Sequence, residues 1–92
     1  MRIEWDDNKN VINKRKHGIS LEAAAYVFDD KYRIEIIDDR HSAEELRYIT
    51  IGKVRSVLFV VYTQRGETSR LISARMATPA ERRMYYGQFD YS

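Results

Sequence analysis

The sequence predicts a single α+β domain, residues 1–92, in which a small antiparallel β-sheet packs against helices. Its 92 residues are 43% hydrophobic and 33% charged, a balance typical of one soluble globular domain. Two β-rich runs, 59–65 and 70–75, are joined by a polar loop that contains Gly66, which indicates a hairpin. Helical patterns precede and follow the strands, so the predicted order is β-α-α-β-β-β-β-α.

The N-terminal third predicts one strand and two helices. Residues 3–5 favour a short strand, and residues 6–8 can cap a first helix that runs to about Lys16 and ends at Gly18. Ser20 can cap a second helix. The apolar positions of that helix recur at i, i+3, i+4 and i+7, which predicts an amphipathic core helix: Leu21, Ala24, Ala25 and Phe28.

The rest of the chain predicts further strands and a last helix. Residues 33–37 and 46–52 favour strands, separated by a charged loop over 38–45, and residues 53–56 favour a turn. Thr78, Pro79 and Glu81 form the pattern of a capping box with proline at the first helical position. This pattern predicts a final helix of about two turns that reaches Tyr85 or Tyr86.

Several kinds of site are disfavoured by composition. The chain has no cysteine, so neither a disulfide framework nor a thiolate metal site is expected. No apolar run approaches the roughly 18 residues of a membrane span, and the first residues lack a signal peptide's apolar segment, so we expect a cytoplasmic protein without membrane contact. The best metal candidates match no known ligand spacing, so no metal or cofactor is predicted: Asp38, Asp39, His41, Glu44 and Glu45.

Positive charge is concentrated in the second half of the chain. Residues 46–92 hold eight Lys/Arg and three acids, whereas residues 29–45 hold three Lys/Arg and seven acids. Such an asymmetry permits a basic face for an anionic partner. Arg65 and Arg75 end the two runs of the hairpin, and their planar guanidinium groups suit a phosphate clamp. The alternative is that both are solvated charges at strand ends.

RNA cleavage by the substrate's own 2′-hydroxyl fits the side chains that remain. The nucleophile belongs to the RNA, so the protein need only orient it, move protons and stabilise charge on the phosphorane. Histidine is the side chain best suited to moving protons near neutral pH, so His17 can move a proton here, or it can be a helix-end histidine that stabilises the helix dipole. Tyr85 can stack on a base or donate a hydrogen bond, or it can pack in the core.

Predicted RNA-binding cations come from two places in the sequence. Lys9 and Lys16 fall on one face of the first helix, together with Asn13 and His17. Arg70 begins the second run of the hairpin. A polar helix face of this kind can also be merely solvated.

Short segments in a fixed order, spread over nearly the whole chain, together match the pattern of one protein family. They are Trp5-Asp6 with Lys9, Asn13 to Ser20, Glu22-Ala23, Val27-Phe28, Ile51-Gly52, Val60 to Arg65, Ile72 to Arg75, and Glu81 with Tyr85. In this combination the chain resembles the BrnT family of toxins. The resemblance implies a RelE-like fold and a metal-independent ribonuclease that arrests translation.

The same resemblance implies a partner and a set of site residues. It implies a type II toxin–antitoxin pair whose BrnA-like antitoxin contributes a ribbon-helix-helix DNA-binding dimer, with a toxin homodimer inside a heterotetramer as one arrangement. It carries most directly to Lys16, His17, Arg65 and Arg75, with Tyr85 as a further catalytic candidate. Two alternatives stay open: a module that occludes RNA or the ribosome without cutting, and a structural partner whose basic face holds an acidic protein.

Overall fold

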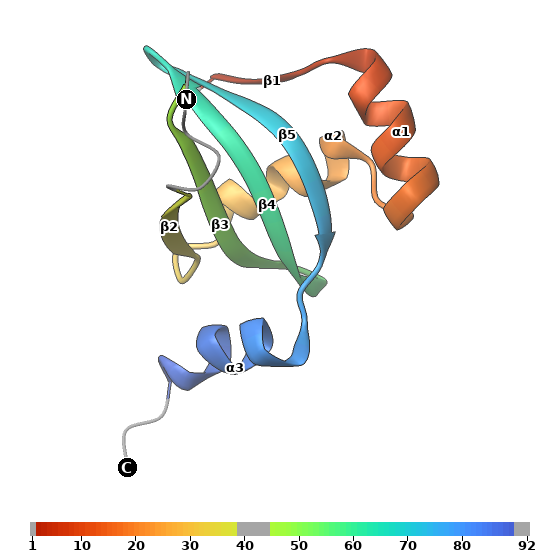
Figure 1. Cartoon of the computed structure of the whole chain (residues 1–92). Helices are drawn as coiled ribbons and strands as arrows, with labels where there is room; N and C mark the ends of the chain where they lie inside the picture. Colours follow the sequence, from red (N-terminus) through yellow and green to blue (C-terminus); the bar gives the residue numbers. More distant parts are fainter. Residues whose placement is uncertain (1, 39–44, 90–92) are drawn as a thin grey trace.

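The structure, a computed structural model, describes residues 2–38 and 45–89 as a five-stranded sheet with helices packed on it (Figure 1). The predicted order of elements is confirmed, with a 3-10 helix continuing the second helix. The elements are β1 (Arg2–Trp5), α1 (Asp7–His17), α2 (Leu21–Ala24), the 3-10 helix η1 (Ala25–Asp29), β2 (Ile34–Asp38), β3 (Arg47–Val54), β4 (Ser56–Arg65), β5 (Thr68–Met76) and α3 (Pro79–Gly87).

The sheet is mixed, which corrects the prediction of an antiparallel sheet. Its strand order is β1-β5-β4-β3-β2, and β2 to β5 form an antiparallel meander. The edge strand β1 instead runs parallel to β5, from Arg2 beside Thr68 to Trp5 beside Leu71. Parallel neighbours need a long crossover, and here everything between β1 and β5 supplies it. Local patterns carry no information about so distant a pairing.

Both hairpins around β4 turn more tightly than the sequence predicts. The predicted loop over 66–69 shrinks to Gly66 and Glu67, because Thr68 already pairs with Arg65. The predicted turn over 53–56 shrinks to Arg55, which adopts a φ of 64°. Pairing extends each strand because every added rung satisfies backbone groups that would otherwise need water.

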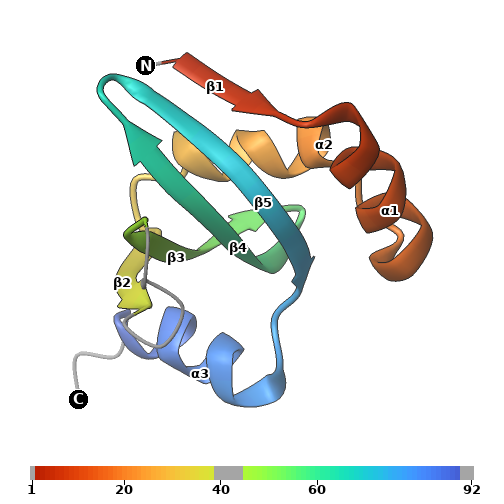
Figure 2. The ribbon, with the colours of Figure 1, turned by 45° about the horizontal axis from the view of Figure 1, so that its top comes forward.

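One face of the sheet is covered by α2 and η1 (Figure 2). Leu21, Ala24 and Val27 are fully buried there, against a set that includes Val60 and Leu71. The predicted core residues Ala25 and Phe28 pack against this cluster but are only partly buried, whereas Val27, which the helical pattern did not predict, is fully buried. After Ala24 the helix tightens into 3-10 geometry, whose period of three residues aligns positions 21, 24 and 27.

The opposite face of the sheet is covered at one end by α3. Tyr85 of this helix is 4% exposed and packs in a second core cluster with Ile49, Ile51 and Val57. The predicted capping box is confirmed, since the side chains of Thr78 and Glu81 each accept a hydrogen bond from the other residue's backbone N–H. Within the described ranges, no helix has the length and apolarity that crossing a membrane requires.

Candidate active site

A partly exposed face of β4 and β5, opposite α2, collects the predicted arginines. Directly paired residues share a face of a sheet, and the register pairs Phe59 with Arg75 and Thr63 with Arg70. A bulge at Ile72 keeps Ser73, which pairs with Val61, on this same face. We call this surface the open face; its members are Phe59, Val61, Thr63 and Arg65 of β4, and Thr68, Arg70, Ser73 and Arg75 of β5.

Arg65 and Arg75 lie at opposite ends of the open face. Arg75 is beside Phe59, and Arg65 follows six residues later on β4, which corresponds to roughly 20 Å at the usual strand rise. The prediction that both guanidinium groups clamp one phosphate is therefore wrong. In an antiparallel pair the end of one strand lies beside the start of the other. Each arginine's own role in catalysis stays a prediction.

The end of the open face near the β4–β5 turn carries two ion pairs. Arg65 donates from Nε and Nη2 to the two carboxylate oxygens of Glu45, at 2.9 and 3.1 Å. These hydrogen bonds lower the pKa of Glu45 to about 2. Arg70 donates from Nη1 to Glu4 Oε1 of β1 at 3.1 Å. Both arginines are partly exposed and keep further N–H donors, so a phosphate can contact them.

The other end of the open face fixes Arg75 from two sides. Its Nη1 and Nη2 donate to the two oxygens of Glu81, at 2.8 and 3.0 Å. Its guanidinium carbon lies 3.8 Å from the centre of the Phe59 ring, a cation–π contact. These hydrogen bonds from Arg75 hold the pKa of Glu81 below its ordinary value. Because 35% of the Arg75 side chain is exposed, this fixed fork is also open to a ligand.

Lys9, Lys16 and His17 are brought together, as their shared helix face predicts. With Ile12 and Asn13 they line a hollow of about 210 Å³ between α1 and β5, where Ile72 and Ser73 form the other wall. In the part of the chain that the structure describes, none of the three cationic or titratable side chains has a hydrogen bond or ion pair. They are therefore available to an anion.

Ser73 connects this hollow to the open face. It lines the hollow beside His17, and it precedes Arg75 by two residues on the same side of β5. Residues two apart on a strand are about 7 Å from each other. One RNA strand crossing the edge of β5 can therefore contact both His17 and Arg75.

Tyr85 lies apart from these groups. Its hydroxyl donates to Asp30 Oδ2 at 2.6 Å, and its ring packs in the core under α3. Burial, followed by the hydrogen bond to Asp30, raises the pKa of Tyr85 well above its ordinary value. The hydroxyl proton of Tyr85 is therefore engaged in the hydrogen bond to Asp30. These contacts are those of a structural residue, and the catalytic role predicted for Tyr85 stays a prediction.

The metal candidates of the sequence are only partly visible. Asp39, His41 and Glu44 lie outside the described residues. Asp38 belongs to β2 and Glu45 pairs with Arg65. Among residues 2–38 and 45–89, no group of three or more His, Asp or Glu side chains is placed to hold a metal ion.

Sequence reasoning missed the partners that orient the arginines. Glu81 was predicted only as a capping residue, yet it also holds Arg75. The short connection between the strand and the capping box could have suggested this contact. Glu45 and Glu4 could not have been found in this way, because they reach Arg65 and Arg70 from residues 20 and 66 positions away.

Comparisons with known proteins agree with this architecture. A family model described as "Ribonuclease toxin, BrnT, of type II toxin-antitoxin system" matches residues 5–81. The crystal structure of the ribonuclease toxin BrnT of Brucella abortus is similar with a TM-score of 0.62 and 25% sequence identity, covering 85% of this chain and 97% of that chain. A comparison with curated protein sequences gave no match. The chain therefore belongs to the BrnT family of ribonuclease toxins of type II toxin–antitoxin systems.

Proposed function

We propose that this chain is a metal-independent endoribonuclease that cuts RNA where the strand crosses the edge of β5. The position of Ser73 carries the proposal. It lines the hollow that holds His17, and it shares the open face with Arg75. A titratable group and a fixed guanidinium group therefore border the same short stretch of surface.

In the proposed reaction, the RNA 2′-hydroxyl attacks the adjacent phosphorus. His17 accepts the hydroxyl proton as general base, the bond to the 5′-oxygen breaks, and the departing oxygen takes a proton from water. The hydroxide left by that water then removes the proton from His17 and restores the base. The products are a 2′,3′-cyclic phosphate and a 5′-hydroxyl end. Arg75 donates to the phosphorane oxygens as negative charge develops on them.

The contacts of Arg75 support this role because they orient the guanidinium group before RNA arrives. Two N–H groups bind Glu81, and Phe59 packs against the guanidinium plane. The remaining donors have a fixed direction, so less side-chain entropy is lost on binding phosphate. Glu81 is in turn held by the backbone N–H of Thr78.

Four further cationic side chains are proposed to bind the RNA phosphates on either side of the cleaved one: Lys9, Lys16, Arg65 and Arg70. The two lysines face the hollow without a partner among the described residues, whereas the two arginines lie farther along the open face. Exposed ion pairs such as Arg65–Glu45 contribute little stability. A phosphate can therefore share or replace the carboxylate.

The cellular role is proposed from the family. Membership of a type II toxin–antitoxin family implies an antitoxin partner. We further propose that the toxin acts in the cytoplasm, that cutting RNA arrests translation, and that a BrnA-like ribbon-helix-helix antitoxin neutralises it. A toxin homodimer within a heterotetramer is the arrangement we propose for the complex.

Incubation of the purified chain with end-labelled single-stranded RNA in excess EDTA tests the chemistry. We expect cleavage at the same rate as without EDTA, and mass spectrometry should find 2′,3′-cyclic phosphate or its hydrolysed form. Activity that disappears in EDTA and returns with magnesium would contradict the mechanism and direct attention to residues 38–45.

Binding of RNA without cleavage is the second candidate. It is favoured by the contact of Tyr85, whose hydroxyl proton is engaged with Asp30 and therefore adds no proton-transfer group to this surface. In the same experiment this candidate requires intact RNA together with a saturable gel shift.

A further inference from the structure

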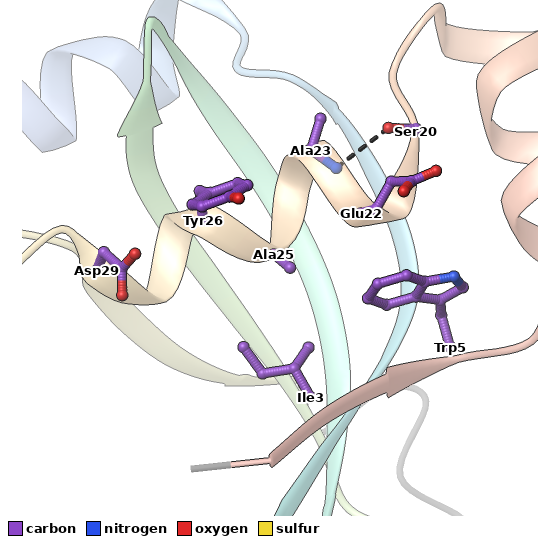
Figure 3. Close-up of a pocket in the computed structure, with 8 residues that line it drawn as sticks. All are labelled: Ile3, Trp5, Ser20, Glu22, Ala23, Ala25, Tyr26 and Asp29. Carbon is purple, nitrogen blue, oxygen red and sulfur yellow. Dashed lines mark hydrogen bonds between the residues drawn. The ribbon is translucent and has the colours of Figure 1, made fainter.

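A second hollow lies on the helix-covered side of the sheet, between β1 and the α2–η1 segment (Figure 3). Its volume is about 540 Å³. Ile3 and Trp5 rise from β1 toward the helical segment, which contributes Ala23, Ala25 and Tyr26. Tyr26 is 65% exposed although it is a large aromatic residue. Partly exposed Trp and Tyr side chains around a depression are the residue types that dominate protein–protein binding energy.

Acidic side chains stand at the two ends of this apolar floor. Glu22 lies near Trp5, and Asp29 lies at the far end of the helical segment (Figure 3). Neither carboxylate has an ion pair among the described residues, and no Lys or Arg lines the hollow. The chain as a whole carries a net charge of +2, so this surface differs locally from the rest. RNA phosphates would be repelled here.

The strand that borders the hollow is also the edge of the sheet. β1 pairs with β5 on one side only, and its other side has no strand neighbour in the described parts of the chain. Backbone groups on such an edge can pair with an incoming polypeptide. Apolar floor, acidic ends and a free strand edge therefore meet at one place.

We propose that this hollow docks a segment of the antitoxin that places a large apolar side chain between two Lys or Arg residues. The apolar side chain would fill the space between Trp5 and Tyr26, and the flanking cations would pair with Glu22 and Asp29. The inference rests on the antitoxin partner that the family implies, and not on RNA cleavage. The two proposals can therefore fail separately.

Site-specific labelling tests whether the antitoxin covers the hollow. The natural chain has no cysteine, so Ala23→Cys introduces a single thiol at the hollow. The matched control is Ala80→Cys, an exposed position of α3, which packs on the opposite face of the sheet. Each variant is treated with a maleimide as free toxin and as the complex purified after co-expression with its antitoxin.

In the complex we expect the modification rate at Ala23→Cys to fall at least tenfold relative to the free toxin. Ala80→Cys reports any general loss of thiol reactivity in the complex. The quantity that tests the proposal is therefore the decrease in modification rate at Ala23→Cys relative to the decrease at Ala80→Cys. Equal rates in the free and bound states would overturn the proposal. Protection that instead grows with the concentration of toxin alone would assign the hollow to a second copy of the chain, and would also overturn it.

Charge reversal tests the chemistry of the docked segment. We expect Glu22→Lys combined with Asp29→Lys to weaken antitoxin binding about tenfold, as expected for losing two partly exposed charge pairs and adding repulsion. Glu67→Lys, at the exposed β4–β5 turn, is the matched control and should leave affinity within about twofold. Unchanged affinity of the double variant would refute a basic segment. Melting temperatures separate these effects from misfolding, and neither labelling nor affinity requires RNA cleavage.

Discussion

Asn13 of α1 exchanges two hydrogen bonds with the backbone of Ala74 in β5, as a neighbouring strand would. Its Nδ2 donates to the Ala74 carbonyl at 2.9 Å, and its Oδ1 accepts from the Ala74 N–H at 3.0 Å. A third bond runs from Nδ2 to the carbonyl of Ile19 at 2.8 Å. The Asn13 side chain thus satisfies the backbone of β5 past the point where its pairing with β1 ends. It also attaches α1, the helix that carries His17, to the sheet.

Asn13→Ala should lower the free energy of unfolding by about 3 kcal/mol. The substitution leaves the N–H and C=O of Ala74 unpaired at a buried position, and each such group costs about 1–3 kcal/mol. Chemical denaturation followed by circular dichroism measures the change. Asn8→Ala, an exposed position of the same helix, should stay within about 0.5 kcal/mol of the natural protein. Similar values for the two variants would mean that the edge is satisfied in another way.

Arg75→Lys should reduce RNA cleavage tenfold to a thousandfold. Lysine keeps the charge but loses the planar fork that binds Glu81 and is proposed to face the phosphorane. Single-turnover rates on labelled RNA measure the loss, with melting temperature recorded alongside. Arg83→Lys on the exposed side of α3 is the matched control and should cut at the natural rate. A rate unchanged in Arg75→Lys would leave Arg75 as part of a basic surface only.

Lys9→Gln and Lys16→Gln should each weaken RNA binding and flatten its dependence on salt. Each lost contact between a lysine and a single-strand phosphate lowers the slope of log K against log[salt] by about 0.7. Fluorescence anisotropy at several salt concentrations gives the slope. Lys14→Gln, on α1 but outside the hollow, is the control. If all three variants gave the same slope as the natural protein, RNA would not enter the hollow.

Tyr85→Phe should lower stability by about 2 kcal/mol while the cleavage rate per folded molecule stays unchanged. The substitution removes the hydroxyl that donates to the Asp30 carboxylate, and hydrogen bonds to charged groups contribute about 1.5–3 kcal/mol. Tyr86→Phe alters a 47% exposed neighbour and should change neither quantity. The opposite result, a large loss of rate at constant melting temperature, would place the Tyr85 hydroxyl in the reaction.

Glu81 should make the stability of the natural protein sensitive to acid. Hydrogen bonds from Arg75 keep its pKa in the folded state below the ordinary value of 4.5. Below pH 4.5 the unfolded chain therefore binds more protons at this site than the folded chain, and stability falls with pH until the folded pKa is passed. Glu81→Gln should be less stable at pH 7 and lose less on acidification. Glu67→Gln provides the control. If the free energy of unfolding of Glu81→Gln and of the natural protein fell in parallel with pH, the proposed contribution of Glu81 would be contradicted.

Helix boundaries were predictable because their signals are local. Asp6, Ser20 and Thr78 each cap the helix that the sequence assigns to them, through hydrogen bonds spanning two or three residues. Val27 was missed as a core residue, because the switch to 3-10 geometry after Ala24 depends on packing against the sheet and not on composition.

The candidate site was predicted in part for the same reason. The grouping of Lys9, Lys16 and His17 follows from helical spacing alone. The separation of Arg65 and Arg75 could have been predicted from the sequence, because the two arginines end the two strands of the predicted hairpin. In an antiparallel pair the end of one strand lies beside the start of the other. The partners Glu4 and Glu45 meet their arginines through contacts between segments that are far apart in the sequence, so no spacing rule reveals them.

The parallel pairing of β1 with β5 has a consequence for the order of assembly. Glu4 and Arg70, which bridge the two strands, are separated by 66 positions. Closing so long a loop is entropically costly before the β2–β5 meander exists, so we expect the N-terminal strand to join last. During synthesis the first strand must wait for the fifth. The apolar hollow beside β1 and the ion pair between Glu4 and Arg70 would then form together, at the final step of folding.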